Sequence, residues 1–364
     1  MQYEFVMITT DTRPDAVCAL LNFTGLLAYP HWREERLGLA ISAGSAAVTG
    51  AVLAHPNGVL GGLALLLVYW WWDRRRFALV HVLWAVLPVA VGFGAWGLYI
   101  SRDVAAFREQ FFHNAQDGNR LAMLRQPWRG VWKELTEKYF GLFSGFTPRG
   151  SAVLRVKLFG TVVMLGALLG ACFHPRFRAA RTWRLLLALT GLYFFTIALF
   201  DGQKQYIYMI HMVPLLCAVG AVYGVTLWRG RYPPKWLLAG ILTGFVLLQV
   251  GGIAYRIREN TYGKLFMPAV TYLKTHAEPG DLIVARAEFA FGFGFTSRLL
   301  DDIRLGYHTG RRPDCIIEDA GYRENWEEYR ATQPALYAHI GRVLREQSEK
   351  VYDAGGYIIY RRRR

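Results

Sequence analysis

The stretch TTDTRPDAVCALLNFTGLLAYPHWREER, residues Thr9 to Arg36, decides the fold. An apolar run in it is preceded by a mixed acidic and basic cluster between Asp11 and Asp15, and is followed by Arg33 and Arg36. A hydrocarbon core about 30 Å thick is crossed by about 20 apolar residues in a helix. Arginine and lysine are retained on the cytoplasmic side of such a helix. The stretch therefore predicts a first membrane helix that enters from the outer face and ends at the cytoplasmic face.

The composition of the whole chain also indicates a membrane protein. The chain has 364 residues, of which 53% are hydrophobic, and its apolar residues are concentrated before Arg256. Length and hydropathy together predict about eight membrane helices. The segments are Ala16–Ala28, Leu37–Ala54, Gly58–Trp72, Phe77–Ile100, Ala152–Phe173, Trp183–Phe200, Tyr206–Trp228 and Trp236–Tyr255.

The net charge of +15 raises the possibility of a nucleic-acid partner, but the placement of the charge argues against it. Arginines and lysines fall in every second loop, whereas the alternate loops His55–Gly58 and Asp201–Gln205 carry almost no basic excess. This pattern is the topology signal of an inner-membrane protein, and no base-reading motif accompanies it. We therefore expect an integral, multi-pass protein of a bacterial inner membrane, bounded by membrane lipids and without nucleic acid. His55–Gly58, Ser101–Ser151, Asp201–Gln205 and everything after Arg256 are expected on the outer face.

The sequence predicts a membrane region at residues 1–256 and a soluble extracytoplasmic α/β domain at residues 257–364. In the second region we expect strands at Leu282–Ala285 and around Cys315–Ile317, and a helix over Asn325–Gln347 interrupted near Pro334. The last residues predict two strands joined at Gly355–Gly356. The segment FAFGFGF, Phe289–Phe295, lacks the spacing of a phosphate-binding glycine loop. The expected fold class is an α-helical polytopic membrane protein with a small C-terminal α/β domain.

The external segment, residues 101–151, contains an amphipathic pattern. Its apolar residues recur at helical spacing with lysines and glutamates between them: Trp128, Val131, Trp132, Leu135 and Tyr139. Such a helix suits the membrane surface. It equally suits a helix packed over the bundle, and the sequence leaves both alternatives open.

Ionisable residues at the outer ends of the helices are the candidates for a site, because charges near membrane segments are functional by default. Arginine and lysine can neutralise phosphate, tyrosine can stack on a sugar or donate to its hydroxyls, and a carboxylate can act as a general base. The candidates are Asp11, Arg13, Asp15, His55, Lys204, Tyr206 and Tyr208, with His211 one turn further.

Each candidate also has a purely structural interpretation. Asp11 and Asp15 can cap a helix, Arg13 can reach lipid headgroups, and the residues that follow His55 can form a tight turn. Lys204 can be a solvated loop cation, and His211 can be a hydrogen-bonded helix histidine. No group of His, Cys, Asp and Glu has the spacing of a metal site, so no metal ligand is predicted.

Several segments resemble the GT-C glycosyltransferases, multispanning enzymes that use polyprenyl-phosphate sugars. They are TRPDAVCALL with the basic turn after it, AGSAAVTGAVLAHPNGVL, KQYIYMIHMVPLL and RLGYHTGRRPDCII. The nearest branch contains lipid A aminoarabinose transferase, the lipopolysaccharide-core sugar transferases of rhizobia and protein O-mannosyltransferases. The resemblance implies a polyprenyl-phosphate-linked sugar as donor, a lipid, glycan or protein as acceptor, and an external active site. It implies a donor site bordered by Arg13, His55, Lys204, Tyr206 and Tyr208.

One departure from that family concerns the catalytic base. The family's catalytic aspartate follows the first membrane helix, whereas no apolar span precedes Asp11 here. We expect an N-terminally shortened chain, or a missing part supplied by another chain, so the catalytic residue stays unknown, with Asp11 and Asp15 as weak candidates. No motif requires a cofactor, although a divalent cation is compatible with the chemistry. The competing functions are a transporter or flippase for a lipid-linked substrate, and a non-catalytic membrane scaffold.

Overall fold

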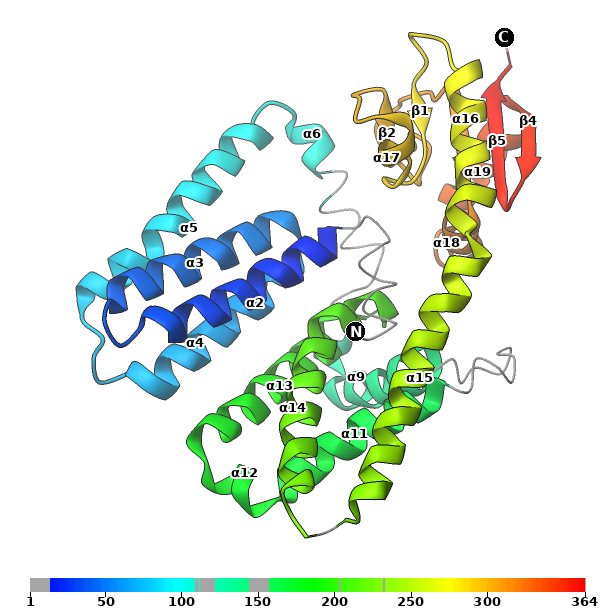
Figure 1. The fold of residues 1–364 in the computed structure, drawn as a ribbon. Helices are drawn as coiled ribbons and strands as arrows, with labels where there is room; N and C mark the ends of the chain where they lie inside the picture. Colours follow the sequence, from blue (N-terminus) through cyan, green and yellow to red (C-terminus); the bar gives the residue numbers. More distant parts are fainter. Residues whose placement is uncertain are drawn as a thin grey trace. The chain divides into compact units, whose positions relative to one another are not determined.

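The protein is described from a computed structural model. The structure describes residues 14–108, 111, 122–143, 157–202, 204–231 and 233–363. The chain divides into two compact units, Met1–Ile253 and Ala254–Arg364. The first unit is helical, and the second combines helices with a five-stranded sheet (Figure 1).

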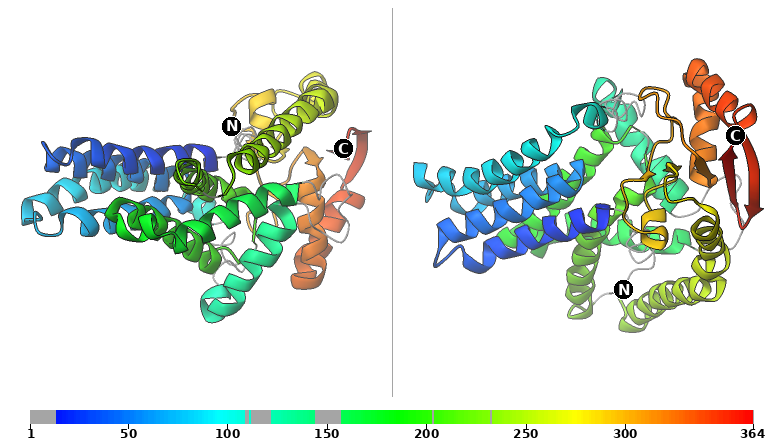
Figure 2. Two further views of the ribbon diagram at one scale, coloured as in Figure 1. Left: turned by 60° about the horizontal axis from the view of Figure 1, so that its bottom comes forward. Right: turned by 90° about the horizontal axis from the view of Figure 1, so that it is seen from above.

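The first half of the helical unit is a set of antiparallel helices. They are α2 (Pro14–Trp32), α3 (Leu37–Ala54), α4 (Val59–Asp73) and α5 (Leu79–Ile100), followed by the short α6 (Val104–Phe107). The α3–α4 turn is a single 3₁₀ turn, η1 (Pro56–Gly58), and a Cβ on Gly58 would lie 2.2 Å from the Val52 nitrogen. Only glycine fits so close a backbone approach. The longer helices α2 to α5 run side by side in Figures 1 and 2.

The second half of this unit packs onto the first through α13 and α14, which contact α4 and α2. One apolar core joins the two halves and contains Tyr29, Leu65, Tyr193 and Met209. The elements are α8 (Ala122–Arg125), α9 (Pro127–Lys133), η3 (Glu134–Phe143), α11 (Lys157–Phe173), α12 (Pro175–Ala179), α13 (Arg181–Phe200), η4 (Tyr206–Tyr208), α14 (Met209–Trp228) and α15 (Lys235–Glu259).

Five helical segments in the described part of the chain are long and apolar enough to cross a membrane. They are Leu37–Ala54, Leu79–Ile100, Arg181–Phe200, Met209–Trp228 and Lys235–His276. The sequence predicted about eight spans, and a helix does form at each of the other three positions. However, α4 has 15 residues and α11 has 17, while α2 contains polar residues such as Asn22 and is less apolar than the five. Five candidate spans are therefore supported by length and composition, and the count of eight stays a prediction.

Two of these helices, α5 and α15, expose apolar side chains that suit a lipid environment. In α5 no residue is buried, and leucines and valines cover its surface. In α15 only Gln249 is buried. Helices that are apolar all round and yet exposed are unfavourable in water, so their surfaces suit hydrocarbon.

The amphipathic pattern of the external segment forms the helices α9 and η3, which bury Glu134 and Lys138 and leave the Lys133–Glu137 pair exposed. The helix α9 packs on α13 at Gly130, whose Cβ would lie 2.7 Å from the Ala198 carbonyl oxygen. Trp128 and Trp132 are 83% and 68% exposed. The helix thus packs over the bundle, one of the two expected alternatives, and presents two tryptophans on its outer side.

The second unit contains a mixed sheet with strand order β2-β1-β3-β5-β4. Strands β2, β1 and β3 are parallel, and β5 pairs antiparallel with both β3 and β4. The strands are β1 (Ile283–Val284), β2 (Leu299–Leu300), β3 (Cys315–Glu318), β4 (Ser348–Ala354) and β5 (Tyr357–Arg362). The remaining elements are η5 (Tyr262–Phe266), α16 (Met267–His276), α17 (Phe289–Phe293), α18 (Ala320–Thr332) and α19 (Pro334–Arg345).

Side chains alternate between two apolar clusters in this unit. Ile317 belongs to the cluster with α16, and Ile316 to the cluster with α18 and α19. This alternation places one layer of helices against each side of the sheet. The strands predicted at Leu282–Ala285, near Cys315 and on both sides of Gly355–Gly356 are present, and the predicted break at Pro334 separates α18 from α19. Strand β2 was not predicted.

Candidate functional site

Asp15 and His55 lie together at one end of the first helices. Asp15 is fully buried in the first turn of α2, and its Oδ1 lies 3.5 Å from Nε2 of His55. The His55 Nδ1 accepts a hydrogen bond of 3.2 Å from the backbone N–H of Asn57. Because Nδ1 is an acceptor, a neutral His55 carries its proton on Nε2, toward Asp15. The Cys18 thiol donates to the His55 carbonyl at 3.8 Å, which ties α2 to this turn.

Tyr208 and His211 reach the same place from the start of α14. The rings of His55 and Tyr208 are 5.8 Å apart, and Tyr208 is buried. His211 is fully buried, and neither of its ring nitrogens has a hydrogen-bond partner among the described residues. Asp15 and His55 lie close enough to interact electrostatically with its ring. We call Asp15, His55, Tyr208 and His211 the polar cluster.

Four buried charged residues form a second group, the ionic tetrad of Glu134, Lys138, Asp201 and Lys204. Lys138 Nζ lies 2.9 Å from Glu134 Oε1 and 2.7 Å from Asp201 Oδ2. Lys204 Nζ lies 3.2 Å from Glu134 Oε2. All four are nearly or wholly inaccessible to solvent. Burying one charge is costly, so two carboxylates and two ammonium groups in contact keep the group neutral.

Lys204 also completes the end of α13. Its Nζ donates to the Ala198 carbonyl at 2.6 Å, one of the last carbonyls of that helix. A cation at a helix C-terminus satisfies such a carbonyl and interacts favourably with the helix dipole. Burial lowers the pKa of the Lys204 ammonium, and the Glu134 carboxylate opposes that shift. The backbone of Lys204 has φ +55°, which costs a non-glycine residue roughly 1–2 kcal/mol, so this placement is strained.

Tyr208 joins the two groups. Its ring centroid lies 5.8 Å from that of His55, and Lys138 Nζ lies 5.7 Å from the same centroid. A cation at this distance from an aromatic face is attracted by the ring quadrupole. The polar cluster and the ionic tetrad therefore form one continuous polar region at this end of the helical unit.

The structure brings together four of the seven predicted site residues: Asp15, His55, Lys204 and Tyr208. Asp11 and Arg13 lie outside the described residues. Tyr206 lies in η4, and its side chain is outside the described part. Lys204 is not the solvated loop cation of the alternative interpretation, because its ammonium is buried against Glu134 and Ala198. His211, noted in the sequence, belongs to the cluster.

Glu134, Lys138 and Asp201 were not among the predicted site residues. Glu134 and Lys138 belong to the charged residues between the apolar positions of the amphipathic pattern. They stand at i and i+4, and the segment that carries them is a π-helix, η3. A π-helical stretch frequently marks a functional site, but no pattern in this sequence predicts that the stretch is π-helical. The one available signal was Asp201, which is the only acidic residue between Glu137 and Glu259 in the sequence.

The opposite end of the helices holds a different set of contacts. Arg33 donates two hydrogen bonds to the Asp73 carboxylate, at 2.7 and 2.9 Å, and Tyr29 donates a third at 2.5 Å. Arg181 at the start of α13 donates to the Trp71 carbonyl. The basic loops are thus gathered at one end of this unit, and the polar cluster lies at the other.

No group of His, Cys, Asp and Glu able to hold a metal ion is present in the part of the chain that the structure describes. Searches against family models, curated proteins and solved structures find no match to this chain.

Proposed function

We propose that the protein is a membrane glycosyltransferase that transfers a sugar from a polyprenyl-phosphate donor to a lipid, glycan or protein acceptor. The resemblance of several segments to the GT-C enzymes supports this proposal. The observation that carries it is the contact of His55 with Tyr208 beside Asp15, with Lys138 Nζ over the same tyrosine ring. Residues that are far apart in the sequence thus meet where the resemblance implies a donor site.

The cluster offers groups that suit recognition of a phosphate-linked sugar. The Tyr208 ring can stack on a sugar face, and the His55 Nε2 can exchange its contact with Asp15 for a donor oxygen. Lys138 and Lys204 can meet a phosphate by exchanging a carboxylate partner for it. We assign donor binding to these residues, while the catalytic base stays unknown, with Asp11 and Asp15 as weak candidates.

The proposed topology has eight crossings of a bacterial inner membrane. It counts α2, α4 and α11 together with the five longer segments. It places the polar cluster and the C-terminal α/β unit on the outer face. The separation of the polar cluster from the basic loops supports this arrangement, because arginine-rich ends are retained in the cytoplasm.

The test is donor binding and transfer by the purified full chain in detergent, with a radiolabelled polyprenyl-phosphate sugar. We expect Tyr208→Leu to weaken donor binding about tenfold, since a lost ring contact is worth roughly 1–1.5 kcal/mol. Tyr99→Leu is the matched control, because Tyr99 is exposed near the end of α5. Tyr208→Phe keeps the ring and should bind the donor better than Tyr208→Leu does.

The competing functions give different results in the same assay. A flippase would move labelled donor across proteoliposomes without transferring its sugar. A scaffold would not bind the donor at all. Unchanged binding by a folded Tyr208→Leu protein, as judged by its thermal unfolding, would contradict the proposed site.

A further inference from the structure

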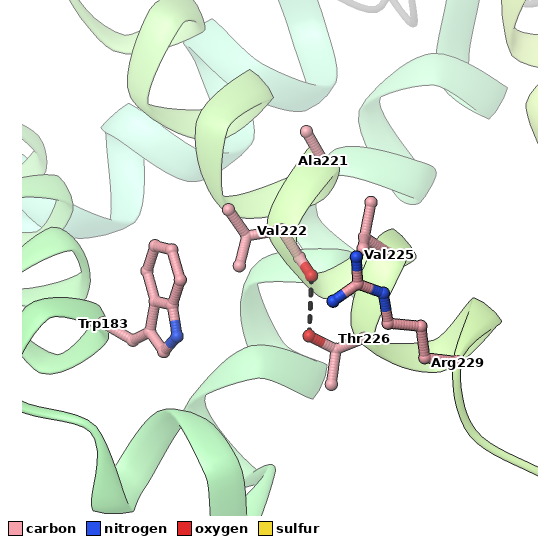
Figure 3. Close-up of a pocket in the computed structure, with 6 residues that line it drawn as sticks. All are labelled: Trp183, Ala221, Val222, Val225, Thr226 and Arg229. Atoms are coloured by element: carbon pink, nitrogen blue, oxygen red, sulfur yellow. Dashed lines mark hydrogen bonds between the residues drawn. The ribbon is translucent and has the colours of Figure 1, made fainter.

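A cavity of about 390 Å³ lies at the basic end of α13 and α14, away from the polar cluster. It is lined by Trp183, Ala221, Val222, Val225, Thr226 and Arg229. In Figure 3 Trp183 stands on one side, and the Arg229 guanidinium turns back along α14 beside Thr226. Val222 and Trp183, which line the cavity, pack against a small apolar core that contains Phe177.

The chemistry of the lining separates into a polar and an apolar part. Arg229 supplies a cation, and the Thr226 hydroxyl donates its proton to the Val222 carbonyl at 2.8 Å. That hydroxyl can therefore only accept a further hydrogen bond. Ala221, Val222 and Val225 form the apolar wall, and the amphipathic Trp183 ring completes it. An occupant with an anionic group, a hydroxyl donor and a hydrocarbon portion matches this lining.

None of the described residues that line this cavity is acidic. Asp201 is the only acidic residue between Glu137 and Glu259, and it lies at the far end of α13 from Trp183. Near the basic end, Asp73 and Glu34 pair with Arg33 and Arg76, and the exposed Glu35 is not part of the cavity lining. Within the described residues, Arg229 forms no ion pair. A cation with no internal partner attracts an anion from the surroundings.

We propose that this cavity binds one anionic glycerophospholipid from the surrounding leaflet. Arg229 contacts the phosphate diester, Thr226 accepts from a headgroup hydroxyl, and the valines and Trp183 contact the first methylenes of an acyl chain. Basic pockets between membrane helices bind anionic headgroups by this combination of charge and apolar area. A phosphatidylglycerol headgroup provides both the phosphate and the hydroxyl.

Lipid titration of the full chain in detergent, followed by native mass spectrometry, tests the proposal. The probes are phosphatidylglycerol and zwitterionic phosphatidylcholine. We expect one phosphatidylglycerol to bind in preference to phosphatidylcholine, and Arg229→Ala to weaken its binding at least tenfold. Trp183→Ala should weaken binding of both lipids, because it removes apolar wall.

Arg178→Ala is the matched control, since Arg178 is an exposed arginine of α12 outside the cavity lining. It should change binding by less than threefold, also in 0.5 M salt, where exposed charges are strongly screened. Equal losses for Arg178→Ala and Arg229→Ala would show diffuse attraction and overturn the site. Stabilisation of the protein by free glycerophosphate as strongly as by the lipid would overturn the role of the acyl chain. Arg229 is exposed, so the variant is expected to fold, and thermal unfolding checks this.

Discussion

The Lys204 ammonium lies between the Glu134 carboxylate and the last turn of α13, and both contacts are buried. Replacing it with Met keeps the side chain's length but leaves Glu134 with one cation instead of two. An uncompensated buried charge typically costs about 3–5 kcal/mol. We expect Lys204→Met to destabilise the protein by about that amount, measured as a loss of thermal stability in detergent.

The paired variant separates charge from packing. Glu134→Gln combined with Lys204→Met removes one charge of each sign and should recover a large part of the loss. Lys133→Ala is the surface control, because its pair with Glu137 is exposed and should cost less than about 1 kcal/mol. A double variant no more stable than Lys204→Met would show that neutrality is not what stabilises the tetrad.

Cys315 in the sheet gives a prediction about reactivity. Burial, together with the Asp281 carboxylate beside it, raises the pKa of the Cys315 thiol to about 11. The thiolate is the reactive form, so the folded thiol should react with a maleimide about 100-fold more slowly at pH 8 than a thiol of pKa 9. The rate should rise tenfold per pH unit up to about pH 11. The measurement is labelling of a variant that retains only Cys315, and fast labelling of the folded chain at pH 8 would contradict it.

At the scale of elements, α3 and α5 approach most closely at a glycine. A Cβ on Gly92 would lie 2.4 Å from Thr49 Cγ2, whereas a Cβ on Gly94 meets nothing within 4 Å. Small residues let membrane helices approach closely, and overpacking such a contact costs about 1–3 kcal/mol. We expect Gly92→Ala to destabilise the protein relative to Gly94→Ala by about this amount. Both variants gain the same helix propensity, so equal melting temperatures would disprove the close contact.

The elements also show what the sequence could predict. Helices are predictable wherever an apolar run is long enough to cross a bilayer, because the length of such a run can be counted in the sequence. The hairpin is predictable because a Gly-Gly pair between two strand-like runs suits a tight turn, and both glycines do have positive φ, +63° and +83°. Strand β2 has two residues, which is too short for any alternating pattern to be visible. Glu134 and Lys138 were missed because only tertiary packing decides which face of an amphipathic helix is buried.

The site was predicted by a different kind of argument. The alternation of basic and non-basic loops predicts the side of every turn, and it therefore predicts that Asp15, His55, Lys204 and Tyr208 share one end of the helices. It could not say which of them touch. Lys204 is an example. The sequence predicts the end of the helices at which it lies, but its ion pair with Glu134 involves a segment 70 residues earlier in the chain.

At the scale of the whole molecule, the opposite placement of the basic loops and the polar cluster can be tested by labelling. Cys172 is exposed near the end of α11, next to the basic residues of α12. Tyr99 is exposed near the end of α5. In a background with the other cysteines replaced by alanine, a membrane-impermeant maleimide applied to spheroplasts should label Tyr99→Cys and leave Cys172 unlabelled.

Inverted vesicles should give the converse labelling, with Cys172 modified and Tyr99→Cys protected. Labelling of both cysteines from one side would show that the chain does not separate its two ends across the bilayer. Labelling of Cys172 alone in spheroplasts would place the polar cluster in the cytoplasm, and the proposed donor site with it.

The neutrality of the ionic tetrad also constrains how this chain can diverge. Two acids and two bases occupy four positions drawn from η3, from the end of α13 and from the turn after it. Loss of any one of them leaves a buried charge of the opposite sign without its partner. During evolution these positions can therefore change only as pairs of one acid and one base. Sequences descended from this one should therefore keep all four residues or lose a carboxylate together with an amine, even where most residues of the surrounding helices have been substituted.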